Sequence, residues 1–303
     1  MYFYRNTKPA RFLRRLNRFV AEVEINENEQ VSADRLPAEM IHSETVHVEQ
    51  VHVKNTGRLR ELLLPGAVVM LQETDNPDRI TRYDLISVYK DGLGWVNIDS
   101  LMPNTLVRQA LEEGILGANA SGSVTFSEEC EQRDGRTDGD QSLSLFDHVE
   151  PFDLVKPEYT YGNSRFDFYM EKRTGLRNKE SKSKGLKDTE SKDNEVGIEK
   201  YLIEVKGCTL ANDQEPGTGL FPDAPTERGI KHLRELIEAS GRGYHCCIAF
   251  VIQMNGITRV LPNEKTHPEF AQALKEAEDA GVQILYLPCE VEADRIQLSS
   301  TVN

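Results

Sequence analysis

The chain has 303 residues, 38% of them hydrophobic, and its 50 acidic and 36 basic residues give a net charge of −14. This length supports a full hydrophobic core and favours two domains. No apolar run is long enough to cross a membrane, and the segment from Met1 to Arg18 lacks the apolar centre of a signal peptide, so we expect a cytoplasmic protein that does not bind membranes. The negative net charge excludes an overall attraction to nucleic acid, so any surface that binds a polyanion must be local.

The five cysteines show no C-x-x-C spacing, and their odd number argues against a disulfide framework. We predict that Cys246, Cys247 and Cys289 are core thiols. A zinc site formed by these residues is the alternative.

The beginning of the chain is locally basic. Six cations precede the first acid, Glu22, and five aromatic residues lie among them. One interpretation is a groove for single-stranded nucleic acid, in which basic side chains pair with phosphates and rings stack on bases. The other is a frayed basic tail. The cations assigned to nucleic-acid binding in the first interpretation are Arg14, Arg15 and Arg18.

Residues 1–99 are predicted to be all-β. Alternating apolar residues and intervening turn sequences predict short strands at 19–25, 46–53, 67–73, 82–89 and 94–98. Five such strands favour a small barrel of the OB type, whose open face commonly binds oligonucleotides. The sequence Asn55-Thr56-Gly57-Arg58 suits a turn whatever its role, and Lys54, Arg58 and Arg60 around it would add phosphate contacts.

Residues 100–303 are predicted to form an α/β domain on a mixed sheet. Apolar stripes predict helices from about 103 to 113, from 226 to 240 and from 268 to 280, and strands are predicted at 246–253 and 282–288. Two polar stretches, 118–150 and 173–199, cannot bury enough apolar surface to order themselves, so we predict that they are disordered insertions.

Two further strands carry charges where a covered strand favours none. Asp167 lies between Phe166 and Phe168, and Glu204 and Lys206 lie in an apolar run. Side chains two residues apart on a strand share a face, so Glu204 and Lys206 must point the same way. Two acids and an amine on one sheet face suit a divalent cation and a phosphodiester, which indicates a nuclease.

Several blocks, in chain order, resemble the signature sequences of the sugar fermentation stimulation protein family, SfsA. They are Asn55-Thr56-Gly57-Arg58, Leu63-Leu64-Pro65-Gly66, Leu101-Met102-Pro103-Asn104 with Leu106-Val107, Ser164-Arg165-Phe166-Asp167, Glu204-Val205-Lys206 and Phe221 to Gly229. The resemblance implies an OB-like domain followed by a PD-(D/E)XK nuclease-like domain, with DNA as the partner. The chain departs from the family pattern in the two insertions, in a third near Asn26 to Glu44, and at Gln109, where many members carry an acid.

The resemblance also implies roles for individual residues. Asp167 and Glu204 would hold Mg²⁺ (or Mn²⁺) together with the backbone carbonyl of Val205, and Lys206 would orient or deprotonate the attacking water. Asp223 and Thr226 are placed to cap the helix that begins near residue 227, and Arg228 in its first turn would meet a phosphate.

Three functions remain open at this point: a metal-dependent nuclease on DNA or RNA, a DNA-binding regulator of sugar metabolism genes without turnover, and a small-molecule or nucleotide-binding protein. The acid pair favours the nuclease, because a pure binder gains nothing from carboxylates that face a polyanion. The absence of a G-x-x-x-x-G-K loop counts against nucleotide hydrolysis. Association into a homo-oligomer is left open by the sequence.

Overall fold

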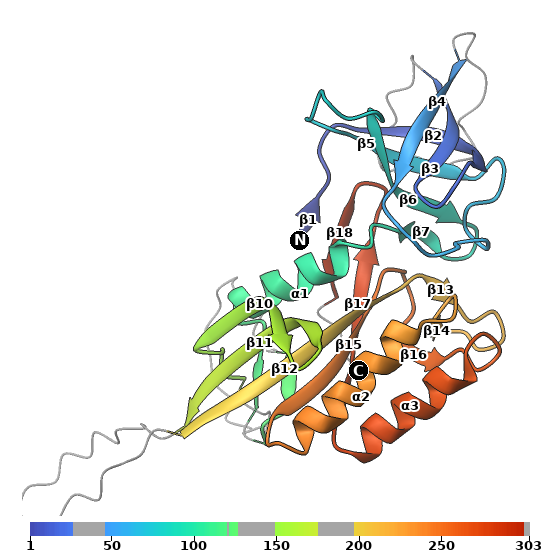
Figure 1. Cartoon of the computed structure of the whole chain (residues 1–303). Helices are drawn as coiled ribbons and strands as arrows, with labels where there is room; N and C mark the ends of the chain where they lie inside the picture. Colours follow the sequence, from blue (N-terminus) through green and yellow to red (C-terminus); the bar gives the residue numbers. More distant parts are fainter. Residues whose placement is uncertain (27–45, 120, 127–148, 175–196, 300–303) are drawn as a thin grey trace, which may run out of the picture.

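The computed structural model describes residues 1–26, 46–119, 121–126, 149–174 and 197–299. These residues form a β-barrel at one end of the molecule and an α/β domain at the other (Figure 1). None of the described helices is long and apolar enough to cross a membrane.

The barrel is closed by five strands, which confirms the predicted OB-like fold. Its strands are β2 (Thr7–Arg15), β3 (Val20–Asn26), β4 (Val46–Val53), β5 (Val68–Glu73) and β6 (Tyr83–Lys90). They are ordered β4-β3-β2-β5-β6, and a parallel pairing of β4 with β6 closes the ring. β7 (Gly94–Asn97) extends the sheet beyond β6. Alternate residues of β3 fill the interior, since Ala21, Val23 and Ile25 are fully buried.

The beginning of the chain is not a frayed tail. β2 lies between β3 and β5 in the barrel, with Ala10 and Phe12 buried. The preceding strand, β1 (Tyr2–Phe3), pairs with β18 (Arg295–Leu298) at the edge of the other domain's sheet. The boundary predicted at residue 99 therefore has an exception, because the first strand belongs to the second domain.

The second domain is built on a mixed sheet, as predicted, and this sheet has seven strands. Its order is β1-β18-β17-β15-β12-β11-β10, with β12, β15 and β17 parallel. The new strands are β10 (Leu154–Tyr161), β11 (Ser164–Thr174), β12 (Gly197–Cys208), β15 (His245–Ile252) and β17 (Gln283–Val291). A smaller sheet contains β13 (Leu210–Ala211), β14 (Thr218–Phe221) and β16 (Arg259–Pro262).

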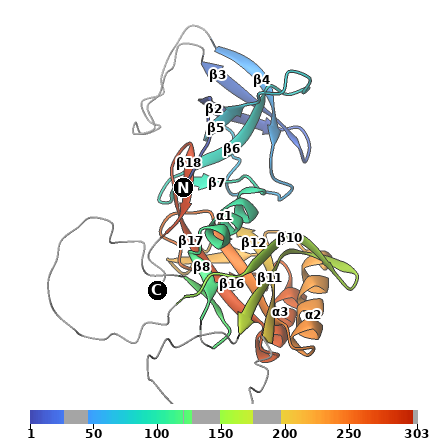
Figure 2. The ribbon, with the colours of Figure 1, turned by 90° about the vertical axis from the view of Figure 1, so that its left-hand side faces the viewer.

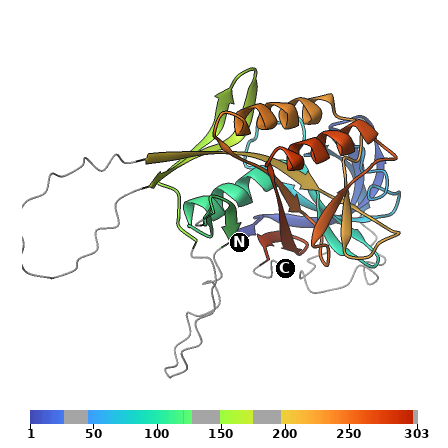
Figure 3. The same ribbon diagram turned by 90° about the horizontal axis from the view of Figure 1, so that it is seen from below.

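Helices cover both faces of the large sheet (Figure 3). α2 (Glu227–Ser240) and α3 (Pro268–Asp279) lie side by side and share a core with Leu202, Ile248 and Phe250. α1 (Met102–Glu112) shares a core with Ile203 and Val205 on the opposite face. Alternation along β12 therefore sends even-numbered side chains toward α2 and odd-numbered ones toward α1.

Parts of the two predicted insertions form strands. β8 (Leu116–Ala118) pairs with β9 (Val124–Phe126), and β11 and β12 extend to residues 174 and 197. The prediction of disorder is wrong at these ends, because pairing to a neighbouring strand satisfies a polar backbone. The remainder of both insertions, and the third insertion from residue 27 onward, lie outside the described residues.

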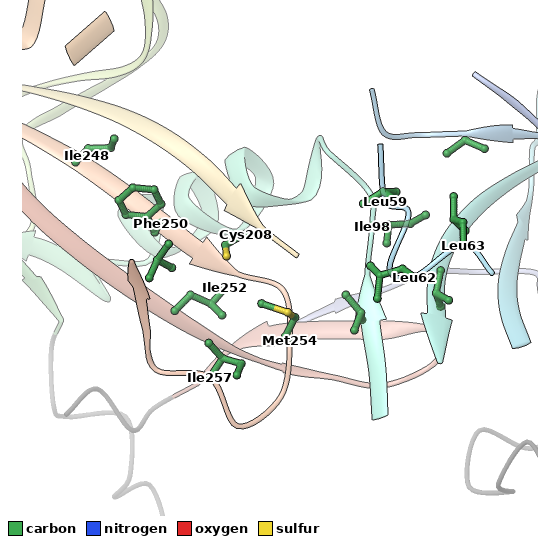
Figure 4. Close-up of a cluster of buried hydrophobic side chains, with 14 of the residues drawn as sticks. Leu59, Leu62, Leu63, Ile98, Cys208, Ile248, Phe250, Ile252, Met254 and Ile257 are labelled. Carbon is green, nitrogen blue, oxygen red and sulfur yellow. The ribbon is translucent and has the colours of Figure 1, made fainter. Parts of the chain in front are cut away.

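The two domains share one hydrophobic core (Figure 4). Leu59, Leu62 and Ile98 from the barrel belong to the same buried cluster as Ile252 and Met254 from the second domain. Polar contacts reinforce this junction, which is also visible from the side in Figure 2. They include Gln253 Nε2 donating to Asn97 Oδ1 at 2.8 Å, Ser87 Oγ donating to the Ala293 carbonyl at 2.5 Å and Arg58 N–H donating to Asp223 Oδ2 at 3.0 Å.

Candidate active site

The two predicted acids lie on neighbouring antiparallel strands. The pairing of β11 with β12 ends at Phe168 and Ile203, and Asp167 and Glu204 are the next residues of the two strands beyond that pair. The backbone N–H of Val205 donates to Asp167 Oδ2 at 2.8 Å. Asp167 therefore lies beside the strand that carries Glu204, close enough for the charge of Glu204 to act on it.

In β11, the alternation of side chains between the two faces of the sheet is interrupted at Asp167. An uninterrupted strand would place Phe166 and Phe168 on one face. Instead, Phe166 belongs to the core beneath α2 and Phe168 to the core beneath α1. This irregularity allows the Asp167 carboxylate to reach a backbone N–H of the neighbouring strand.

Glu204 is buried, at 3% exposure, beneath α2. Its Oε1 accepts hydrogen bonds from Lys206 Nζ and from His232 Nδ1 of α2. Its Oε2 is buried and has no hydrogen-bond partner among the described residues. Glu204 and Lys206 share a sheet face as predicted, and one buried carboxylate oxygen of Glu204 is left unsatisfied by the described residues.

Helix α1 also contacts Asp167, from the face of the sheet opposite to α2. Asn104, in the first turn of α1, donates to Asp167 Oδ1 at 2.7 Å. Gln109 is directed elsewhere, because its amide donates to Glu113 Oε1 at 2.8 Å. The first helix therefore contributes an amide, and no acid, to the site.

Sequence reasoning missed Asn104 and His232 as site residues. Asn104 had no signal except its place in a family block. His232 directly precedes Leu233 on the apolar stripe of α2, and its burial on that face is the signal that could have found it.

The pKa values of the two acids are displaced in opposite directions. Burial raises the pKa of Asp167, and the charge of Glu204 raises it further, against the hydrogen bond from Val205 and the charge of Lys206. Burial alone would also raise the pKa of Glu204. The contacts with Lys206 and His232 outweigh this effect and hold the pKa of Glu204 below its ordinary value. Additional positive charge beside Asp167 would therefore be stabilising.

A cation at this place would rest on few protein ligands. Within the described ranges, no group of three or more His, Cys, Asp or Glu side chains is gathered in a way that could hold a metal. The protein's share would be two carboxylates and a backbone carbonyl near Val205. The described cysteines, Cys208, Cys246, Cys247 and Cys289, are buried free thiols and form no zinc site.

A cleft of about 400 Å³ between the domains leads to Lys206, and we call it the interdomain cleft. Its barrel wall includes Arg18, Asn55, Thr56 and Gly57. Its other wall includes Lys206 to Leu210, the loop from Phe221 to Thr226, and Arg228. A Cβ at Gly57 would lie 2.6 Å from Asp223 Oδ2, so a larger residue here would have to displace that side chain. The Asn55 turn and the Phe221 block, distant in sequence, therefore form one surface.

The two predicted capping residues behave differently. Thr226 caps α2, because its Oγ1 accepts from the N–H of Gly229 at 3.0 Å. The prediction for Asp223 is wrong. Its carboxylate accepts from the N–H of Arg58 instead, because the barrel turn comes close to this loop.

The cations predicted to bind nucleic acid fall into two groups. Those with structural partners are Arg14, which pairs with Glu22 at 2.7 Å, Lys54, which pairs with Asp99 at 2.5 Å, and Arg15. The Arg15 guanidinium donates to five backbone carbonyls, those of Asn17, Arg18, Asn55, Gly57 and Arg58, at 2.6–3.2 Å. Arg15 thus holds together the turns that form the barrel wall of the interdomain cleft.

The other cations are exposed. The side chains of Arg18, Arg58 and Arg60 make no ion pair or hydrogen bond within the described part of the chain. Arg228 lines the interdomain cleft, and its Nε lies 3.4 Å from His232 Nε2. Of these four arginines, Arg18 and Arg228 line the interdomain cleft.

This fold and site define a two-domain protein with an OB barrel and a restriction-endonuclease-like α/β domain. Residues 13–98 match the family model of the SfsA N-terminal OB domain, and residues 101–295 match that of the sugar fermentation stimulation protein RE domain. The chain therefore belongs to the sugar fermentation stimulation protein (SfsA) family.

Similar proteins span nearly the whole chain. Sugar fermentation stimulation protein homologs from Desulfitobacterium hafniense and Ruminiclostridium cellulolyticum are each 38% identical to it, over 99% of this chain and 96–97% of theirs. A solved structure of Pyrococcus furiosus SfsA in complex with Ca²⁺ shares the fold, with a TM-score of 0.66 and 22% identity over 98% of this chain and 95% of that one.

Proposed function

We propose that this protein is a cytoplasmic, metal-dependent nuclease that hydrolyses phosphodiester bonds in DNA or RNA. The observation that supports this most directly is the buried Glu204 carboxylate, whose Oε2 lacks a hydrogen-bond partner among the described residues and whose charge acts on Asp167 of the neighbouring strand. Leaving a buried carboxylate oxygen unsatisfied is costly unless a ligand completes it.

The donors at this site fit Mg²⁺ or Mn²⁺. Carboxylate oxygens of Asp167 and Glu204 and a backbone carbonyl near Val205 are hard ligands, and water would supply the rest. The Ca²⁺ bound to the Pyrococcus relative has the same preference for oxygen ligands, which supports the proposal. When bound, the cation would neutralise the two acids and stabilise negative charge on the phosphate.

The protein's own residues would position the reactants. Asn104 and the Val205 N–H fix the Asp167 carboxylate, and His232 fixes that of Glu204. Lys206 is largely covered but lines the interdomain cleft, where its ammonium would orient the attacking water and offset charge on the phosphate. In the reaction, the water oxygen bonds to phosphorus and the leaving oxygen departs with a proton.

The second candidate is a DNA-binding regulator of sugar metabolism genes that does not cut. Lys206 and His232 both donate to Glu204 Oε1, and a buried network of this kind is also compatible with a purely structural role. In that case, the cleft would bind nucleic acid while the acids only stabilise the sheet.

A cleavage assay separates the two candidates. The protein is incubated with single-stranded and duplex DNA and RNA in Mg²⁺, Mn²⁺ or EDTA, beside Glu204→Gln and Lys206→Met. We expect cutting that needs the metal and falls by at least about 100-fold in each variant, because each removes a charge from the reacting site.

Lys200→Met is the matched control. Lys200 lies on the same strand, but it is exposed and contacts the Tyr244 ring. Its variant should cut like the wild type. Cutting that persists in EDTA would contradict the proposal, and binding without cutting by the wild type would favour the regulator.

A further inference from the structure

The Glu204 carboxylate lies between two hollows of the surface. Lys206, one of its partners, lines the interdomain cleft. His232, its other partner, lines a groove of about 610 Å³ beside α2, which we call the α2 groove. Arg228 lines both hollows. A long ligand could therefore pass from the cleft to the groove across the candidate active site.

The α2 groove is basic in a strongly acidic chain. Four cations line it, Arg165, Arg228, Lys231 and Arg234, against two acids, Glu227 and Glu235. Arg234 is exposed and makes no ion pair or side-chain hydrogen bond with any described residue. In a protein with a net charge of −14, such a local excess suits the phosphates of a nucleic-acid backbone.

The interdomain cleft cannot widen easily. Its two walls are joined by the bond from the Arg58 N–H to Asp223, by the bond from Gln253 to Asn97 and by the shared core beneath them. Its volume of about 400 Å³ is that of a small-ligand pocket. A nucleotide of an unpaired strand fits this space, whereas a double helix does not.

An exposed aromatic residue directly follows a cleft-lining arginine in the sequence. Phe19 follows the cleft-lining Arg18 in the same turn, and 49% of its surface is exposed. A ring beside a cation is the combination with which single-strand-binding proteins stack bases and hold phosphates.

We infer that the ligand of this site is a single strand of nucleic acid, which enters through the interdomain cleft past Lys206, passes Arg228, which lines both hollows, and continues along the α2 groove past His232. Phe19 stacks on a base beside the cleft. This inference rests on the proposed function, because it names the substrate class of the same site.

The test measures binding in EDTA, so that it does not depend on cutting. Fluorescence anisotropy compares a labelled single strand with a duplex of the same sequence whose ends are closed by hairpin loops. We expect the single strand to bind at least about tenfold more tightly, and Phe19→Ala to weaken that binding about fivefold or more.

Two matched controls accompany these measurements. Phe3→Ala removes a similarly exposed ring, 54% exposed, from β1, where neither neighbour in the sequence lines the cleft. Arg18→Glu reverses a charge in the cleft wall, and Arg5→Glu reverses an exposed charge that does not line it. Only Phe19→Ala and Arg18→Glu should weaken binding of the single strand.

Equal affinity for the single strand and the closed duplex would overturn the inference. So would an affinity for the single strand that neither Phe19→Ala nor Arg18→Glu changes. Cutting of the closed duplex as fast as the single strand would do the same while leaving the proposed nuclease standing. Selective binding of the single strand without any cutting would support the inference and reject the nuclease.

Discussion

Replacement of Lys206 by Met removes the main positive neighbour of a buried carboxylate. The Lys206 and Glu204 side chains are 17% and 4% exposed, so water replaces little of the lost interaction. Removing one partner of a buried ion pair costs about 3–5 kcal/mol. Because His232 still donates to Glu204 Oε1, we expect a loss of about 2–4 kcal/mol at neutral pH in EDTA. This corresponds to a melting temperature lower by about 4–8 °C in a protein of this size.

The pH dependence of this loss follows from the pKa of Glu204, which Lys206 and His232 hold below its ordinary value against the effect of burial. A depressed carboxyl pKa stabilises the folded state above the unfolded pKa, about 4.3. That contribution disappears as the pH falls through the folded pKa. The difference between wild type and Lys206→Met should therefore be largest near neutral pH and shrink in acid.

Thermal and urea unfolding, followed by circular dichroism at several pH values, measure both quantities. Lys200→Met is again the control and should change stability little. A loss below about 1 kcal/mol at neutral pH, or a difference that is equal in acid, would refute the description of Lys206 and Glu204 as a buried, coupled pair.

Three further predictions concern other residues. Because the pKa of Asp167 is raised, its charge destabilises the metal-free protein above that pKa. Asp167→Asn should therefore raise the melting temperature at neutral pH in EDTA by a few degrees and abolish cutting. A lower melting temperature would contradict this. Gly57→Ala should cost about 1–3 kcal/mol in urea unfolding, because its Cβ meets Asp223, whereas Gly241→Ala, with no heavy atom closer than 3.6 Å, should be neutral or stabilising. Arg15→Lys should lower the free energy of unfolding by about 2 kcal/mol or more, since an ammonium cannot donate to five carbonyls at once. Unchanged urea unfolding would show that these hydrogen bonds contribute little.

The parts of the site that the sequence predicted depend on local periodicity. The two-residue alternation of a strand is enough to place Glu204 and Lys206 together, and the apolar stripe with Thr226 before it is enough to place α2 within a residue of its observed start. The pairing of the strands that carry Asp167 and Glu204 was expected because the two strands flank one insertion.

Contacts between elements distant in sequence were not predictable in this way. His232 and Asn104 reach the acids only because α2 and α1 cover opposite faces of the sheet. Asp223 suits a helix cap by residue type, but the approach of the barrel turn gives it a different partner.

Strand β2 was missed for a local reason. Its cations, Lys8, Arg11, Arg14 and Arg15, resemble a basic tail, and a bulge between Phe12 and Arg14 interrupts the alternation that would reveal a strand. Burial of Ala10 and Phe12 in the closed barrel, together with the carbonyls that surround Arg15, outweighs that charge pattern.

The family models divide the chain near residue 100, yet Leu59 and Leu62 of the barrel are buried in one apolar cluster with Met254 of the other half. If the chain were cut at the linker, each half would expose an apolar surface to water and tend to aggregate. The apolar residues of this shared core must therefore be replaced before either half is studied alone.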